Sequence, residues 1–161
     1  QNCKMKDGHG GVTIGSEISG GCRNVYAENC EMDSPNLDRA IRVKANTFRG
    51  GLVENIYVRN IKVGEVGDAV IHFDMKYEPA EGKNGGFVPQ WRNIEIRNVT
   101  SMKSKYALYL VGLEDSPIKN LVIEDCKFNQ VAQKSVIENL DNPEFEDLFV
   151  NGKKIVTEVK K

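Results

Sequence analysis

Residues 54–63, ENIYVRNIKV, decide the fold because their pattern recurs along the chain. Each copy has a polar residue, then Asn or Asp, then an aliphatic residue and alternating side chains up to a second Asn, Asp or similar residue. The copies stand at 23–32 (RNVYAENCEM), 92–101 (RNIEIRNVTS), 119–128 (KNLVIEDCKF) and, in a shorter form, 146–155 (EDLFVNGKKI). A repeat of about 20–50 residues is typical of solenoids and related arrays.

A second short apolar segment follows each of the first four copies. These segments are AIRV from Ala40, AVIH from Ala69, ALYL from Ala107 and SVIE from Ser135. Two short alternating strands in each repeat, with no helical period between them, indicate a coil of parallel strands. The sequence therefore predicts an all-β, right-handed parallel β-helix. A β-sandwich is the alternative, but it gives no reason for an Asn at the same place in every repeat.

The repeat predicts columns of like side chains that run from coil to coil. Val25, Ile56, Ile94 and Leu121 should stack on one side of their strands, and the Asn residues before them should form an amide ladder. Cys3, Cys30 and Cys126 share one repeat position with Ile61 and Val99. Free cysteine behaves as a small hydrophobic residue, so we expect these three to be buried, reduced and free of metal.

Length and charge limit the classes of protein. The chain has 161 residues and a net charge of −1, which fits a single β-helix segment over 1–161 with no nucleic-acid or membrane partner. The spacing of the four cysteines matches neither a metal site nor a disulfide framework, and no cofactor is expected. Because residue 1 aligns to the interior of a coil, we expect the chain to be the C-terminal part of a longer β-helix.

A glycine-rich stretch with one histidine, DGHGGVTIGSEISGG (7–21), occupies the place of a second strand in the first coil. Aligned to the next coil, Val12 and Ile14 match Ile41 and Val43, which point inward. Arg42 and Lys44 then lie on the outer face, about 7 Å apart along the strand. Two cations above a glycine floor, with His9 at its edge, predict a site for a flat anionic ligand.

These residues resemble glycoside hydrolase family 28, the polygalacturonases and their exo-acting relatives. The resemblance rests on Gly8-His9-Gly10 and on Arg42-Val43-Lys44, where the family has Arg-Ile-Lys, with IGSE, RGGLVENI and LFVNGK as further similar segments. It implies inverting hydrolysis of α-1,4-linked galacturonate in pectin. The family takes its acid and base from Asn-Thr-Asp and Asp-Asp motifs, and neither occurs here. The parent is thus expected to be an enzyme and this segment alone to be inactive.

The resemblance also implies roles for four residues. Arg42 and Lys44 would bind the uronate carboxylate, His9 would be an auxiliary catalytic residue, and Tyr77 would line the cleft. The alternatives are solvated surface cations, a loop histidine bonded to backbone, and a tyrosine packed at a strand end. His72 is interpreted as structural, and Asp7, Asp33, Asp38 and Asp74 are not taken as catalytic acids.

The loop 78–90 is predicted to be an insertion that walls the cleft, a feature of exo-acting members that leaves exo action as an option. The expected partner is an acidic polysaccharide, polygalacturonate or its oligomers, bound by a monomer that is secreted or periplasmic. Two alternatives remain: a non-catalytic carbohydrate-binding β-helix and a purely structural one. A pectate lyase-like protein is disfavoured because acidic clusters for calcium are lacking.

Overall fold

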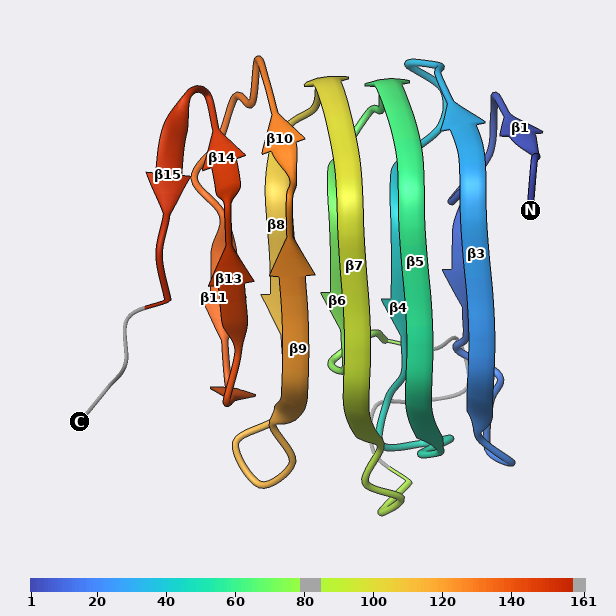
Figure 1. The fold of residues 1–161 in the computed structure, drawn as a ribbon. Helices are drawn as coiled ribbons and strands as arrows, with labels where there is room; N and C mark the ends of the chain where they lie inside the picture. The colour runs from blue at the N-terminus through green and yellow to red at the C-terminus, as the bar shows by residue number, and fades with distance from the viewer. Residues whose placement is uncertain (79–84, 158–161) are drawn as a thin grey trace.

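The computed structural model describes residues 1–78 and 85–157, and in these ranges every regular element is a strand. Ten of the described strands form a larger sheet and five form a smaller one (Figure 1). The larger sheet comprises β1 (Lys4–Met5), β3 (Cys22–Met32), β5 (Leu52–Glu65), β7 (Gln90–Lys103), β9 (Ile118–Glu124), β10 (Lys127–Phe128), β12 (Leu140–Asp141), β13 (Glu144–Glu146), β14 (Leu148–Val150) and β15 (Lys153–Ile155). The smaller sheet comprises β2 (Val12–Ile14), β4 (Arg39–Lys44), β6 (Ala69–Asp74), β8 (Tyr106–Val111) and β11 (Val136–Glu138).

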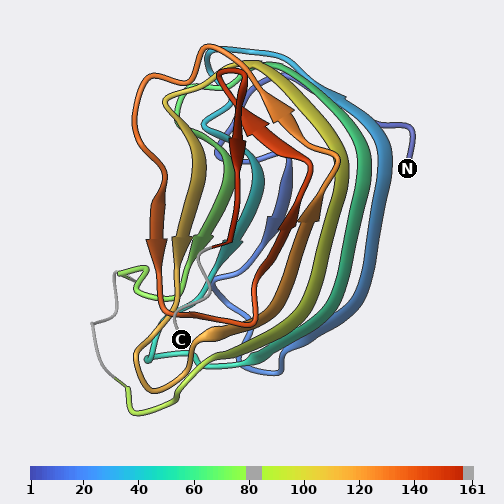
Figure 2. The ribbon, with the colours of Figure 1, turned by 60° about the vertical axis from the view of Figure 1, so that its left-hand side comes forward.

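The chain winds as a coil that visits the two sheets in turn. In the larger sheet β1, β3, β5 and β7 are neighbours, and in the smaller sheet the order is β11-β8-β6-β4-β2. Neighbouring strands from successive turns pair in parallel, and crossovers of this kind are right-handed. At the C-terminal end β14 and β15 pair antiparallel. Figure 2 shows the turns nested one behind another. The predicted right-handed parallel β-helix is confirmed, and the β-sandwich alternative is wrong.

Apolar columns fill the space between the sheets. Val25 is in register with Ile56, Ile56 with Ile94, and Ile94 with Leu121, as the repeat predicted. Across the coil, the smaller sheet contributes buried residues such as Ile41, Val43, Ile71 and Phe73. The core is therefore built by stacking similar side chains, so each turn stabilises the next.

Asparagine both bends the long strands and links the coils. In β5, Asn55 and Asn60 have positive φ angles of 57° and 56°, a conformation that Asn adopts far more readily than most residues. The amide of Asn55 donates to Asn24 Oδ1 at 3.1 Å, and the same bond recurs from Asn93 to Asn55 and from Asn120 to Asn93. The predicted amide ladder is confirmed.

A second amide ladder lies at the next bend. Asn60 donates to Asn29 at 3.0 Å and Asn98 donates to Asn60 at 2.8 Å. The repeat pattern contains this second Asn position, directly before the cysteine column. Both bends of the long strands are thus held by side-chain bonds between coils.

Two of the three cysteines in the predicted column are buried as expected. Cys30 pairs with Ile61, Ile61 with Val99, and Cys126 continues the column next to the Lys127–Thr100 pair. Cys30 and Cys126 are buried and free. The prediction is wrong for Cys3, which is exposed, because in the described residues only the turn of Cys30 packs against it.

Two searches of the described residues gave negative results. Within 1–78 and 85–157, no group of three or more His, Cys, Asp or Glu residues lies close enough to hold a metal ion. The same described ranges include no helix with the length and hydropathy of a membrane span.

Part of the predicted loop 78–90, residues 79–84, lies outside the described residues. Its described end packs on the segment that follows β4, where the amides of Gly85 and Phe87 both donate to the Thr47 carbonyl, at 3.1 Å and 2.8 Å. A role of this loop as a wall of the cleft stays a prediction.

Candidate functional site

The candidate site lies on the outer face of the smaller sheet, over β2 and β4. Val12 pairs with Ile41, Thr13 with Arg42 and Ile14 with Val43, which is the register that the sequence predicted. Ile41 and Val43 are buried in the core. Since side chains alternate along a strand, Arg42 and Lys44 belong to the opposite face.

The glycines beneath these cations are required by close contacts. A Cβ on Gly10 would collide with the Thr13 hydroxyl and lie 3.4 Å from Arg42 Cβ. A Cβ on Gly15, whose φ is 95°, would collide with the Lys44 carbonyl oxygen. The chain therefore passes directly beside the two cations at positions that only glycine fits.

Arg42 is not the solvated surface cation that the sequence left open as an alternative. Its side chain is 7% exposed, its Nη1 donates to the His9 carbonyl at 3.3 Å, and its Cζ lies 5.7 Å from the Tyr77 ring centroid. Burial, followed by the charge of Arg39, lowers the pKa of Arg42, but a guanidinium stays protonated in proteins. Arg42 is thus a fixed, partly desolvated positive charge.

Lys44 and Tyr77 complete a compact group. Lys44 is half-buried, and its Nζ lies 4.5 Å from the centroid of the Tyr77 ring. The Tyr77 amide donates to the Ala45 carbonyl at 3.2 Å, which turns the chain after β6 back over β4. The three residues predicted to bind substrate are therefore brought together, although slightly more than one turn of the coil separates Tyr77 from the cations in sequence.

His9 stands at the edge of this group, with its backbone bonded to Arg42 and its ring bonded to Asp38. The His9 Nδ1 lies 2.9 Å from Asp38 Oδ2, and the imidazole is 88% exposed. Asp38 Oδ2 also lies 3.5 Å from Arg39 Nη1, and Arg39 Nη2 lies 2.7 Å from Asp68 Oδ2. The sequence analysis missed Asp38 as a partner of His9, although the register that places Val12 beside Ile41 places His9 beside Asp38.

The outer row of the sheet continues from Arg42 through two aromatic rings. Arg42 pairs with His72 and His72 with Tyr109. The His72 and Tyr109 rings stack at 4.6 Å with an interplanar angle of 4°, and His72 is 5% exposed. Burial, and then the charges of Arg39 and Arg42, lower the pKa of His72 to about 4, so its ring is neutral at pH 7. The buried stack agrees with a structural role for His72.

The remaining carboxylates that were not taken as catalytic acids have local partners. Asp7 accepts a bond from the Ser34 hydroxyl at 2.6 Å, and Asp33 accepts from the Glu65 amide at 2.9 Å. Asp74, in register with Lys44, accepts from the Lys76 amide at 2.8 Å. Burial raises the pKa of Asp74, and its bond to the Lys76 amide opposes that rise.

The geometry forms a cationic surface with a histidine at its edge. Two cations share one aromatic ring, one of them is fixed by burial, and a histidine with an oriented imidazole stands beside them. Charged donors of this kind bind carboxylates strongly. The fold and the site together define a right-handed parallel β-helix protein with a cationic, aromatic site on its smaller sheet.

Comparison with known proteins gives the family. The model for glycosyl hydrolases family 28 matches residues 1–146, and the chain belongs to this family. It is 27% identical over 129 residues to a probable polygalacturonase from Vitis vinifera and 32% identical over 99 residues to a polygalacturonase from Ralstonia nicotianae. These matches cover 76% and 60% of this chain but only 25% and 18% of the relatives.

Solved structures show the same fold. An exopolygalacturonase from Thermotoga maritima superposes with a TM-score of 0.83 and 31% identity, over 94% of this chain and 34% of that one. A family 28 exopolygalacturonase from Yersinia enterocolitica superposes with a TM-score of 0.64 and 18% identity, over 94% and 30% of the two chains. The chain therefore spans about a third of the length of these relatives.

Proposed function

We propose that this chain is the substrate-carboxylate-binding part of a pectin-degrading glycoside hydrolase. The observation that carries the proposal is the group of Arg42, Lys44 and Tyr77, in which both cations lie over one ring on the outer face of the sheet. The substrate would be α-1,4-linked galacturonate, since the relatives are named polygalacturonases. A uronate carboxylate offers the charge that two adjacent cations bind.

The two cations would divide the work of binding. Arg42 is held by the His9 carbonyl and by burial, so its planar fork offers donors in a fixed direction. Lys44 is half-buried on a flexible stem and would follow the carboxylate as a point charge. The Tyr77 ring would hold both cations in place. A carboxylate partner would neutralise their charge, whereas the ring leaves it available for the substrate.

His9 would act as an auxiliary catalytic residue. If Nδ1 carries the proton and donates a hydrogen bond to Asp38, Nε2 is left as a hydrogen-bond acceptor. The lone pair of Nε2 then points away from Asp38. An imidazole fixed in this way can accept a bond from a substrate hydroxyl or from a catalytic carboxyl group. Asp38 would then be a positioning residue, acting through His9.

The catalytic acid and base would come from parts of the whole protein outside these 161 residues. Inversion needs two carboxyl groups about 6.5–9.5 Å apart, one to protonate the leaving oxygen and one to activate water. The Asn-Thr-Asp and Asp-Asp motifs that supply them in the family do not occur in this sequence. Residues 1–161 alone would therefore bind substrate without hydrolysing it.

The setting of the enzyme follows from its substrate. A pectin polymer is met outside the cytoplasm, so the whole protein is proposed to be secreted or periplasmic. The protein is proposed to act as a monomer. A net charge of −1 in this segment supplies no excess of positive charge for nucleic acid or an anionic membrane surface.

The proposal is tested by comparing the whole protein with residues 1–161 on polygalacturonate. The whole protein should release reducing ends, proton NMR of the first product should show the inverted β-anomer, and the sizes of the products separate exo from endo action. Residues 1–161 should release none above a buffer control, yet bind tetragalacturonate in calorimetry. A whole protein that binds without cleaving would support the carbohydrate-binding alternative, and one that does neither would support the structural alternative.

A further inference from the structure

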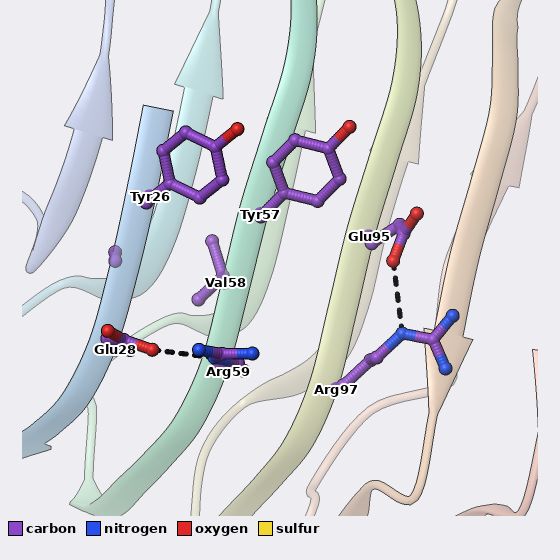
Figure 3. Close-up of a pocket in the computed structure, with 8 residues that line it drawn as sticks. Tyr26, Glu28, Tyr57, Val58, Arg59, Glu95 and Arg97 are labelled. Carbon is purple, nitrogen blue, oxygen red and sulfur yellow. Dashed lines mark hydrogen bonds and ion pairs between the residues drawn. The ribbon is translucent and has the colours of Figure 1, made fainter. Parts of the chain in front are cut away.

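A second surface of interest lies on the larger sheet, on the opposite side of the coil from the sheet that carries Arg42 and Lys44. The outer face of β3, β5 and β7 has a hollow of about 240 Å³ (Figure 3). Its chemistry comes from Tyr26, Glu28, Tyr57, Arg59, Glu95 and Arg97, which we call the tyrosine groove. None of these residues belongs to the site described above.

The apolar part of the groove is a pair of aligned tyrosines. Tyr26 and Tyr57 are in register on β3 and β5, with ring centroids 5.0 Å apart and planes 16° apart. Figure 3 shows the two rings side by side, with their hydroxyl groups pointing the same way. Tyr57, which has β3 on one side and β7 on the other, is half-buried, so the core does not account for the pair.

The row changes character at the next strand. Tyr57 is in register with Glu95 on β7, so a carboxylate stands where a third ring would be. The row runs from Tyr26 through Tyr57 to Glu95. If another coil packed against β3, it would add a residue beside Tyr26, and Glu95 would still follow Tyr57.

The charges of the groove are already paired. Arg59 Nε lies 2.6 Å from Glu28 Oε2, and Arg97 Nε lies 3.1 Å from Glu95 Oε2. Arg97 also forms an ion pair with Glu124 through its Nη1. A charged ligand would have to break these pairs. Nucleic-acid grooves combine aromatic rings with unbalanced positive charge, which the groove lacks. Paired carboxylates and guanidinium groups still offer acceptors and donors side by side, the arrangement that hydroxyl groups can use in both directions.

We propose that the tyrosine groove binds a neutral oligosaccharide. The apolar face of a pyranose ring would lie on Tyr57 and Tyr26, and its hydroxyl groups would bond to Glu95, Arg97 and Arg59. The hollow is smaller than the pockets of about 300–1,000 Å³ that take drug-sized ligands, so it suits one or two sugar rings on an open surface. This site is separate from the anion-binding surface proposed above and would hold the protein on neutral chains near its acidic substrate.

The test is an NMR titration of the whole protein with β-1,4-linked galactotetraose as the neutral probe. Binding should shift the ring signals of Tyr26 and Tyr57, and Tyr26→Ala and Tyr57→Leu should each weaken it about tenfold, or about 1.4 kcal/mol. Tyr26→Ala changes an exposed side chain, and Tyr57→Leu keeps most of the apolar volume, so both should fold. Lys62→Ala, an exposed change on the same sheet, is the matched control and should bind as the parent does.

A second ligand separates this site from the anion-binding surface. Tetragalacturonate should bind with an affinity that depends on Lys44 and is unchanged by Tyr57→Leu, whereas galactotetraose should show the reverse. No binding of galactotetraose at millimolar concentration, or binding unaffected by both tyrosine changes, would overturn the proposal. That result would leave the function proposed for Arg42 and Lys44 untouched, because the two ligands report on different faces.

Discussion

His9 and Asp38 form a directed pair, with His9 Nδ1 2.9 Å from Asp38 Oδ2 across two neighbouring turns of the coil. The carboxylate is in turn within reach of Arg39, which is bonded to Asp68. The imidazole is exposed, but its orientation is fixed because the Asp38 carboxylate faces its Nδ1.

Replacing Asp38 with alanine should change the tautomer of His9. In the parent we expect the neutral ring to carry its proton on Nδ1, because Asp38 is a charged acceptor. In Asp38→Ala the population protonated on Nε2 should rise, which ¹⁵N chemical shifts of the imidazole measure directly. Glu17→Gln, an exposed carboxylate change away from His9, is the control, and an unchanged tautomer in Asp38→Ala would show that Asp38 does not position the ring.

The cysteines should differ sharply in their reaction with iodoacetamide. Cys3 is exposed, whereas Cys30 and Cys126 are buried, and burial raises the pKa of Cys126 to about 12. Because the thiolate is the reacting form, Cys126 should be modified only on unfolding. Peptide mapping after a short exposure of the native protein should find Cys3 labelled and Cys30 and Cys126 unlabelled. Labelling of Cys126 at the rate of Cys3 would contradict the packing of its column.

Asn60 contributes to stability in two ways, through its backbone conformation and through its side-chain hydrogen bonds, and two substitutions separate them. Asn60 bonds both Asn29 and Asn98 and has a φ of 56°. Asn60→Ala loses two exposed hydrogen bonds and forces alanine into a conformation that costs about 1–2 kcal/mol, so we expect a loss of about 2 kcal/mol in unfolding free energy. Asn60→Gly loses the same bonds without that strain and should be about 1 kcal/mol less destabilising in urea unfolding. Equal losses would mean that the bend contributes nothing.

The repeat made the fold predictable, because a solenoid uses the same short-range rule in every turn. Alternation assigned Ile56 and Ile94 to one column, and the Asn before each predicted the amide ladder. The predicted register also implied a contact that was not predicted. Aligning Val12 with Ile41 places His9 beside Asp38.

Two features could not be predicted from the repeat. The burial of Arg42 depends on Tyr77 and on the His9 carbonyl, which reach it through turns that follow no period. The tyrosine groove was not predicted because Tyr26 and Tyr57 occupy outward positions of an otherwise regular pattern. Side chains on outer faces are not constrained by packing, so the repeat pattern itself carries no sign of what they bind.

His72 should make the fold less stable in acid. Its pKa is about 4 in the folded protein and about 6.5 when unfolded, so between these values the unfolded chain binds more protons. Stability from this group is complete above about pH 6.5 and is lost as the pH falls toward 4, by at most about 3 kcal/mol. Asp74, whose pKa is raised by burial, acts in the opposite sense.

The variant His72→Phe isolates this contribution, because it keeps a ring against Tyr109 and removes the titration. Urea unfolding between pH 4.5 and 7.5 should show a weaker loss of stability in acid for this variant than for the parent, while Asp74 contributes to both. Tyr109→Phe keeps His72 and should keep the parent's slope. If the unfolding free energy changes with pH equally in His72→Phe and in the parent, His72 has the same pKa in the folded and unfolded chains.

Lys44→Ala should weaken the action of the whole protein on polygalacturonate much more than it weakens the fold. Lys44 is half-buried over Tyr77, and a cation–π contact at such a site is worth about 0.5–1 kcal/mol, so the melting temperature should fall only slightly. A charge-assisted bond to a uronate carboxylate is worth about 1.5–3 kcal/mol, or roughly tenfold to more than a hundredfold in kcat/KM.

Methyl-esterified pectin distinguishes a binding role of Lys44 from a structural one. Esterification removes the carboxylate charge, so the loss of kcat/KM caused by Lys44→Ala should shrink on this substrate. Lys62→Ala, which removes an exposed lysine from the larger sheet, should act like the parent on both substrates. Equal losses on the acidic and esterified polymers, or a collapse of the melting temperature, would show that Lys44 supports the fold. The anion-binding role of the surface above Gly15 would then fall with it, because Lys44 is the more exposed of the two cations and Arg42 is only 7% exposed.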